Sequence, residues 1–235
     1  MSKQLHSELK KEFQLERMIL FSDAIFAIAI TLLVLEIRVP ELNRHTATDQ
    51  ELSVILDDMV PKFIGFLVSF FVIGLYWTVH HRMFGYVVNY TPKLLWLNLV
   101  FLLAVVLMPF STGFYSTYLL RYLKVPVIIY ISNVVFLGGM NLILWRYISN
   151  PKLELVEGLG ETEKKYYFFR AIAVPIIFIL CAGVYLFVTK KYAVWIPPFI
   201  PLIMRILTRR YRKNLDALKK RSDLSAETKR QIEST

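Results

Sequence analysis

The sequence has little cysteine and lacks the short motifs that mark most enzymes. Its one cysteine, Cys181, cannot form an internal disulfide, so cysteine usage says nothing about redox compartment. The chain contains no P-loop, no glycine-rich dinucleotide turn, no His-Glu-x-x-His and no Gly-x-Ser-x-Gly. No nucleophile is placed beside a base. We therefore expect no enzymatic activity and no cofactor.

Two well-known channel signatures are also missing. There is no Thr-Val-Gly-Tyr-Gly segment, which excludes a potassium filter of the usual carbonyl type. No apolar run carries a cation at every third residue, as a voltage-sensing helix would.

Residues 1–17 are charged and amphipathic and lack the apolar core of a cleavable signal. We expect them to form a cytoplasmic N-terminal segment.

Long hydrophobic runs are what the sequence does have. Of 235 residues, 56% are hydrophobic, and a membrane-spanning helix needs about 20 consecutive, mostly apolar residues. The runs are too long for barrel strands and do not alternate, so spanning helices remain. The sequence predicts an all-α membrane protein whose domain, residues 18–207, has six transmembrane helices. The predicted spans are 18–37, 63–79, 94–115, 125–145, 168–188 and 192–207, the last interrupted by Pro197, Pro198 and Pro201.

The basic residues predict which ends of these helices face the cytoplasm. With six spans, 21 of the 28 Lys and Arg fall on the side that holds both termini. Cytoplasmic segments carry such a surplus, so we expect a multi-pass protein of the cell membrane with both termini cytoplasmic. The net charge of +10 is explained in this way, and we expect no nucleic-acid partner. Residues 208–235 form a basic tail suited to anionic lipid headgroups.

The most informative segment is the first span, RMILFSDAIFAIAITLLVLEIRVP, residues 17–40. An ionisable residue inside a span is costly, so Asp23 should face protein or water. At about 100° per residue, Ile28, Leu32 and Leu35 share one stripe with Thr31 on its shoulder, and Asp23 points away from it. Periodicity leaves three roles open for this stripe, which can line a pore, face lipid or pack in a core. Asp23 can equally hold the structure or contact ions.

A second polar segment ends the second span at the same depth as Asp23. It contains Trp77, His80 and His81, whose ring N–H groups are natural donors to a carboxylate. Adjacent histidines on a helix diverge by about 100°, and no Cys, Asp or Glu cluster completes a ligand set. We therefore predict no metal site here.

These segments together resemble a known family. The motif Arg17-x3-Phe21-Ser22-Asp23, followed by AIFAIAITLLVLEIRVP, resembles the first helix of the prokaryotic transmembrane protein 175 family, relatives of the endosomal and lysosomal potassium channel. Trp77-x2-His80-His81 and the stretch from Leu94 to Phe114 are also similar to that family. The resemblance covers roughly the first half of the chain and the number of spans.

The resemblance implies a homotetramer in which the first helix of each subunit lines a central pore. It implies a constriction at Ile28, further apolar layers at Leu32 and Leu35, and a hydroxyl associated with selectivity at Thr31. It also implies a structural network around the motif, with one of the two histidines taking part. The residues of that network are Arg17, Phe21, Ser22, Asp23, Trp77 and His80 or His81.

We accordingly expect a potassium-permeable cation channel with a hydrophobic constriction and no carbonyl filter. Its partners would be further copies of the chain, membrane lipids and permeant K+, with Na+ passing less well. An alternative is a proton-coupled or small-solute transporter that uses Asp23 and a histidine as a relay. A third possibility is a non-conducting membrane scaffold in which Ile28 faces packed protein.

Overall fold

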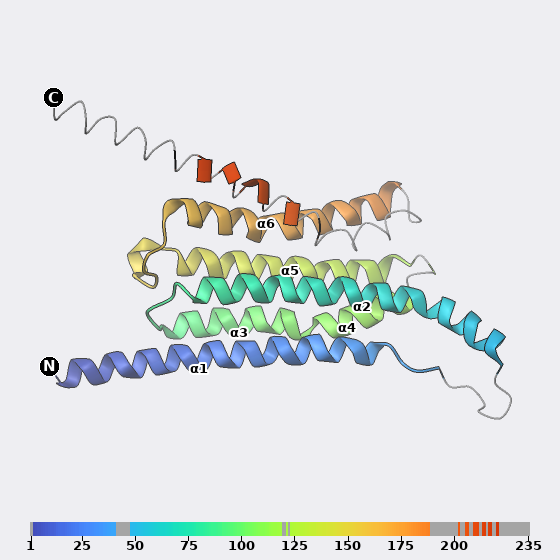
Figure 1. Cartoon of the computed structure of the whole chain (residues 1–235), viewed down its shortest axis with the longest axis horizontal. Helices are drawn as coiled ribbons and strands as arrows, with labels where there is room; N and C mark the ends of the chain where they lie inside the picture. The colour runs from blue at the N-terminus through green and yellow to red at the C-terminus, as the bar shows by residue number, and fades with distance from the viewer. Residues whose placement is uncertain are drawn as a thin grey trace.

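The computed structural model describes residues 2–40, 48–118, 121, 123–188 and scattered positions between 202 and 220. Over these residues the fold is helical, and the long helices lie side by side in one bundle (Figure 1). They are α1 (Ser2–Leu32), η1 (Leu33–Glu36), α2 (Asp49–Phe84), α3 (Pro92–Val106), α4 (Met108–Tyr118), α5 (Lys124–Ile148), η3 (Pro151–Leu153), α6 (Glu161–Gly183) and η4 (Val184–Val188).

Five helical stretches in the described part of the chain are long and apolar enough to cross a membrane. They comprise α1 with η1, α2, α3 with α4, α5, and α6 with most of η4. The predicted all-α membrane class is therefore confirmed, and the chain is a multi-pass membrane protein. The predicted sixth span, 192–207, and the predicted tail, 208–235, lie mostly outside the described residues.

The second helix is much longer than its predicted span. Thr48 caps α2 through a capping box, since its hydroxyl accepts from the Glu51 N–H and the Glu51 carboxylate accepts from the Thr48 N–H. Its 36 residues would measure about 54 Å at 1.5 Å per residue, against about 30 Å for the hydrocarbon core. The first turns of α2 accordingly extend beyond the other helices (Figure 1).

The third predicted span is broken into two helices. Helix α3 ends at Val106 and α4 begins at Met108, with Leu107 between them. Pro109 lies at the start of α4 and has no N–H to bond with the preceding turn. The helical hydrogen bond that would cross the break from position 109 is therefore missing. The break was not part of the sequence prediction.

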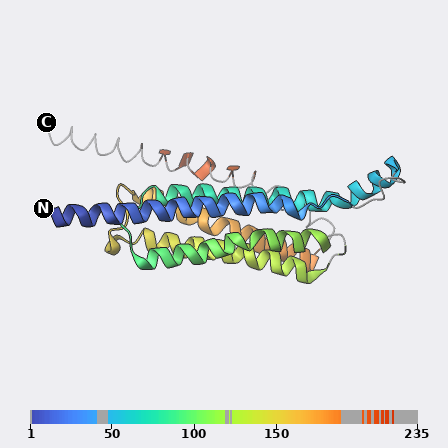
Figure 2. The same ribbon diagram turned by 90° about the horizontal axis from the view of Figure 1, so that it is seen from below.

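Helix α1 lies at one edge of the bundle and α6 at the opposite edge, with α2, α3 and α5 between them (Figures 1 and 2). The start of α1, the α2–α3 turn and the α5–α6 connection lie at the same end of the bundle (Figure 1). There the two connections pair through an antiparallel bridge between Val87 and Val156. Three of the basic segments predicted to share one side of the membrane therefore share one end of the molecule, and the fourth, the C-terminal tail, lies mostly outside the described residues.

A single apolar core joins the helices. It includes Phe26 of α1, Ile73 of α2, Phe101 of α3 and Leu137 of α5, all at most 1% exposed. Burial of such side chains fixes which face of α1 turns inward, and so positions the candidate site.

Candidate functional site

Helix α1 has two sharply different faces. Its inward face consists of buried side chains at helical spacing, namely Met18, Ser22, Phe26, Ala29 and Leu33. On the opposite side, Ile28 is 57% exposed and Leu35 is 66% exposed, and Leu32 and Thr31 are exposed as well. The structure thus places the stripe predicted from periodicity on the outer surface of the single chain.

Small and polar side chains accompany the apolar stripe. Ala24, Ala27 and Thr31 are all exposed along α1, and they recur every three or four residues beside Ile28. The Thr31 hydroxyl donates to the Ile28 carbonyl oxygen at 2.8 Å. Because that bond uses the hydroxyl hydrogen, the lone pairs of the Thr31 oxygen remain available on the exposed face.

A buried chain of three polar side chains holds the inward face of α1. The Ser22 hydroxyl donates to the Met18 carbonyl oxygen at 2.7 Å and accepts from Asn98 Nδ2 of α3 at 2.8 Å. The other amide atom of Asn98, Oδ1, lies 2.8 Å from His80 Nε2 of α2. An amide oxygen can only accept, so His80 Nε2 carries the hydrogen. Three helices therefore meet at one hydrogen-bonded set.

Aromatic rings enclose this polar set. The His80 ring stacks on Phe84 with centroids 4.2 Å apart and on Phe101 at 5.4 Å. Phe26 of α1 packs against both His80 and Phe101. The enclosure keeps the three polar side chains buried, with His80 only 1% exposed. Inside such a site a lost hydrogen bond is not replaced by water.

Asp23 is held by a separate contact. Trp77 Nε1 of α2 donates to Asp23 Oδ1 at 2.9 Å, and the His81 ring stacks on Trp77 with centroids 5.6 Å apart. The two adjacent histidines thus have different neighbours. His80 reaches Ser22 through Asn98, whereas His81 contacts the tryptophan that binds Asp23. The sequence had left open which histidine contacts the motif.

The structure does not bring the other two motif residues into these contacts. The Arg17 guanidinium lies over the Phe13 ring, 5.7 Å from its centroid, and does not pair with Asp23 within the chain. Phe21 is 49% exposed on the outer side of α1. Both residues therefore lie on the surface that the single chain leaves uncovered.

Asn98 is the site residue that sequence reasoning did not assign. Its only signal in the sequence was an amide inside an apolar span, which predicts a tie between helices without naming the partners. In the described part of the chain, no group of three or more His, Cys, Asp or Glu side chains could hold a metal ion.

Fold and site together define a class, a helical membrane protein whose apolar first helix is tied by Ser22 and Asp23 to its second and third helices and presents an uncovered apolar face on the other side. Residues 17–109, which hold the contacts of Ser22, Asp23, Trp77, His80 and Asn98, match the model of the family described as endosomal/lysosomal potassium channel TMEM175. This part of the chain is therefore similar to the TMEM175 family.

Individual proteins are similar to part of this chain. A protein of Streptomyces collinus named as a potassium channel is 39% identical over 99 residues, which cover 42% of this chain and 46% of the relative. A Danio rerio protein named endosomal/lysosomal proton channel TMEM175 is 38% identical over 80 residues, 32% of this chain and 15% of its own. The alignment with the Streptomyces relative thus spans about half of that protein's length.

Similarity to a solved structure extends further along the chain. The crystal structure of a TMEM175 homolog from Chamaesiphon minutus, described as a lysosomal potassium-selective channel, aligns with a TM-score of 0.70 and 25% identity. The alignment covers 84% of this chain and 99% of that one. The helical arrangement therefore matches well beyond residues 17–109.

Proposed function

We propose that this chain forms a potassium-permeable cation channel, in which four copies of α1 surround one axis. The observation that supports this proposal most directly is the outer face of α1, where Ile28, Leu32 and Leu35 form an uncovered stripe beside Thr31. The names of the relatives support potassium as the permeant ion.

The composition of that face favours contact with other helices over contact with lipid. Ala24 and Ala27 leave room for a second backbone, and small residues are typical of close helix packing in membranes. Helix α1 is also the least covered of the candidate spans, with 28% of its apolar window buried against 39–50% in the others. An assembly around α1 would cover the face that the chain itself leaves open.

The mechanism follows from what the stripe offers to an ion. A ring of four Ile28 side chains supplies no oxygen to replace lost hydration, so a narrow ring closes by dewetting. A slightly wider ring passes a cation that sheds part of its water, and K+ holds its water less tightly than Na+. Thr31 adds four oxygens whose lone pairs point outward from each helix. We expect weaker selectivity than a carbonyl filter gives.

Two side-chain contacts, one buried and one exposed, give α1 a fixed rotation. Asn98 fastens Ser22, and Trp77 fastens Asp23 one residue later, so two neighbouring positions of α1 are tied to two other helices. A turn of α1 about its axis would break both contacts. In this proposal Asp23 has a structural role and sets which residues reach the axis.

A transporter that uses Asp23 and a histidine as a relay has less support. Within the described residues, Asp23 is hydrogen-bonded to Trp77, and His80 is hydrogen-bonded to Asn98. Among the described residues, no hydrogen bond therefore joins the Asp23 carboxylate to either imidazole. The relay would need a rearrangement of α1 against α2.

Flux through reconstituted protein tests the channel. Ile28→Asn should wet the constriction, raise K+ flux into liposomes and lower the preference for K+ over Na+. Ile176→Asn, an equal substitution at a 48% exposed position of α6, serves as the control and should leave both unchanged. Unaltered flux and selectivity in Ile28→Asn would remove this residue from the constriction. Saturable exchange with slow turnover would instead support the transporter. The absence of any flux would support the non-conducting scaffold.

A further inference from the structure

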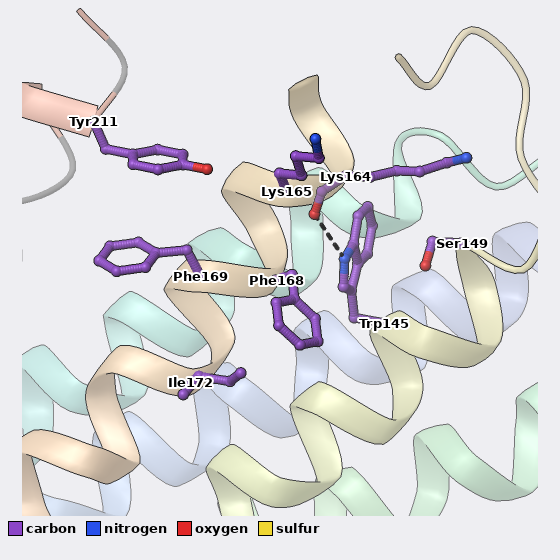
Figure 3. A pocket seen from close by; sticks show the side chains of 8 residues that line it. All are labelled: Trp145, Ser149, Lys164, Lys165, Phe168, Phe169, Ile172 and Tyr211. Atoms are coloured by element: carbon purple, nitrogen blue, oxygen red, sulfur yellow. Dashed lines mark hydrogen bonds between the residues drawn. The ribbon is translucent and has the colours of Figure 1, made fainter. Parts of the chain in front are cut away.

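A cavity of about 470 Å³ lies at the end of the bundle that holds the α5–α6 connection (Figure 3). The last turns of α5 contribute Trp145 and Ser149, and the first turns of α6 contribute Lys164, Lys165 and Phe168. The site lies far from α1, on the opposite edge of the bundle (Figure 1). The proposed channel mechanism makes no use of it.

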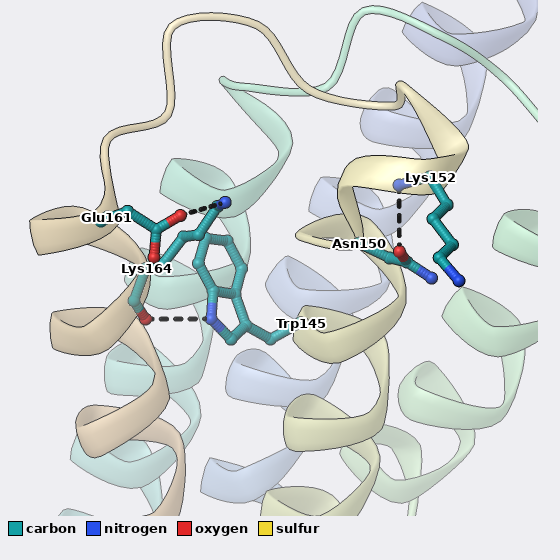
Figure 4. Close-up of polar contacts among 5 residues, drawn as sticks. All are labelled: Trp145, Asn150, Lys152, Glu161 and Lys164. Carbon is teal, nitrogen blue, oxygen red and sulfur yellow. Dashed lines mark hydrogen bonds and ion pairs between the residues drawn. The ribbon is translucent and has the colours of Figure 1, made fainter.

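The inner part of the cavity is apolar. Trp145 is 1% exposed, and its indole N–H donates to the Lys164 carbonyl oxygen at 3.3 Å, which fixes the ring as one wall (Figure 4). Phe168 and Ile172 continue the lining along α6, deeper in the bundle (Figure 3). From Lys164 to Ile172 the helix rises about 12 Å. The apolar wall is therefore long enough to follow the upper part of an acyl chain.

The opposite end of the cavity is polar and basic. Figure 3 shows the two lysine side chains and the Ser149 hydroxyl on the side away from Ile172. Lys164 pairs with Glu161 at 2.7 Å, across the first turn of α6 (Figure 4). Lys165 makes no hydrogen bond or ion pair within the described residues. One ammonium group is thus free, and a second is held by a carboxylate that is largely exposed.

A second basic segment lies at the same place. Tyr211 forms part of the cavity wall, and its ring stacks on Phe169 with centroids 5.0 Å apart. Arg209, Arg210 and Lys213 are exposed beside it. The segment around Tyr211 is therefore basic, and these three side chains line a separate pocket with Asp216.

We propose that this cavity binds an anionic phospholipid, with its phosphate at Lys165, Lys164 and Ser149 and one acyl chain along Phe168 and Ile172. The depth of the residues identifies the ligand. The two lysines lie in the first turns of an apolar span that begins at Glu163, so their ammonium groups lie at the depth of the lipid headgroups. The apolar wall runs from there toward the middle of the span. A soluble anion would leave that wall without a partner. Basic side chains at such a depth attract anionic headgroups.

Lipid retention on the purified full-length chain tests this site. The protein is incubated with phosphatidylglycerol and phosphatidylcholine in detergent, and bound lipids are counted by native mass spectrometry. Removal of both charges in Lys164→Gln/Lys165→Gln should weaken phosphatidylglycerol binding by tenfold or more, since each basic residue near an anionic surface contributes about fivefold. Glu161→Gln frees Lys164 and should strengthen binding.

Two further variants distinguish lipid binding in this cavity from general attraction of anionic lipids to a basic protein surface. Lys93→Gln/Lys152→Gln removes equal charge at the same end of the bundle outside the cavity, and it should bind like the wild type. Ile172→Trp fills the apolar wall without changing charge and should weaken retention of both lipids. Equal losses in the two double-lysine variants, or wild-type retention in Lys164→Gln/Lys165→Gln, would overturn the proposal. Full displacement by inorganic phosphate would also overturn it. Because binding is measured without ion flux, the result is independent of channel activity.

Discussion

Replacement of Asn98 by leucine tests whether the buried contact with Ser22 and His80 holds the first helix in place. The substitution keeps the forked shape of the side chain, although leucine is larger, and removes both hydrogen bonds that the amide makes. Hydrogen bonds between membrane helices contribute about 0.6 kcal/mol each on average. A buried donor left without an acceptor, here His80 Nε2–H, costs about 1–3 kcal/mol more. We expect Asn98→Leu to lower the free energy of unfolding by about 2–4 kcal/mol.

Asn141 offers a matched control inside the same chain. It is also fully buried in a span, and neither of its amide atoms has a hydrogen-bond partner within the described residues. Asn141→Leu removes polar atoms that make no bond, so stability should stay unchanged or rise by up to about 1 kcal/mol. Unfolding by sodium dodecyl sulfate in mixed micelles, followed by circular dichroism, measures both variants. Equal destabilisation of the two, or wild-type stability of Asn98→Leu, would refute the reasoning.

Three further predictions concern other positions. Asp23→Ala should reduce the yield of assembled protein in detergent before it changes selectivity. Asp23→Asn keeps an oxygen that can accept from Trp77, so it should restore the yield. A well-assembled Asp23→Ala protein with altered selectivity would contradict this prediction. Gly138→Ala should lower stability by about 1–3 kcal/mol, because the new methyl group meets the Pro175 ring. Gly139→Ala, with open space around it, should raise stability by about 0.5–1 kcal/mol in the same unfolding assay with sodium dodecyl sulfate. Thr31→Val removes the exposed oxygen and should bring the K+/Na+ permeability ratio measured in liposomes toward unity, while an unchanged ratio would exclude Thr31 from selectivity.

Helical periodicity was enough to predict the two faces of α1. The residues at positions 28, 32 and 35 share a stripe because a helix repeats every 3.6 residues, whatever its surroundings. The fold class followed for a similar reason, since runs such as 18–37 exceed what a soluble helix needs to bury. Neither prediction required knowledge of which helices touch.

The partners of the polar residues could not be predicted in this way. Whether His80 or His81 contacts the motif depends on the rotation of α2 against α1 and α3, which tertiary packing sets. Asn98 is 76 residues from Ser22, and the pairing has no local signature in the sequence. The break at Leu107 was missed although Pro109 signals it, because the apolar run continues across both helices.

The central claim, that first helices of neighbouring copies face one another, is tested most directly by cross-linking in membranes. Ile28→Cys is made in a Cys181→Ala background, which removes the chain's own cysteine, and the membranes are oxidised before electrophoresis without reductant. A disulfide forms only where two Cα atoms approach within about 7 Å. We predict covalent dimers for Ile28→Cys and none for Ile128→Cys, an exposed position of α5. Monomeric Ile28→Cys that reacts with a lipid-soluble maleimide as readily as Ile128→Cys would place this residue against lipid and contradict the account.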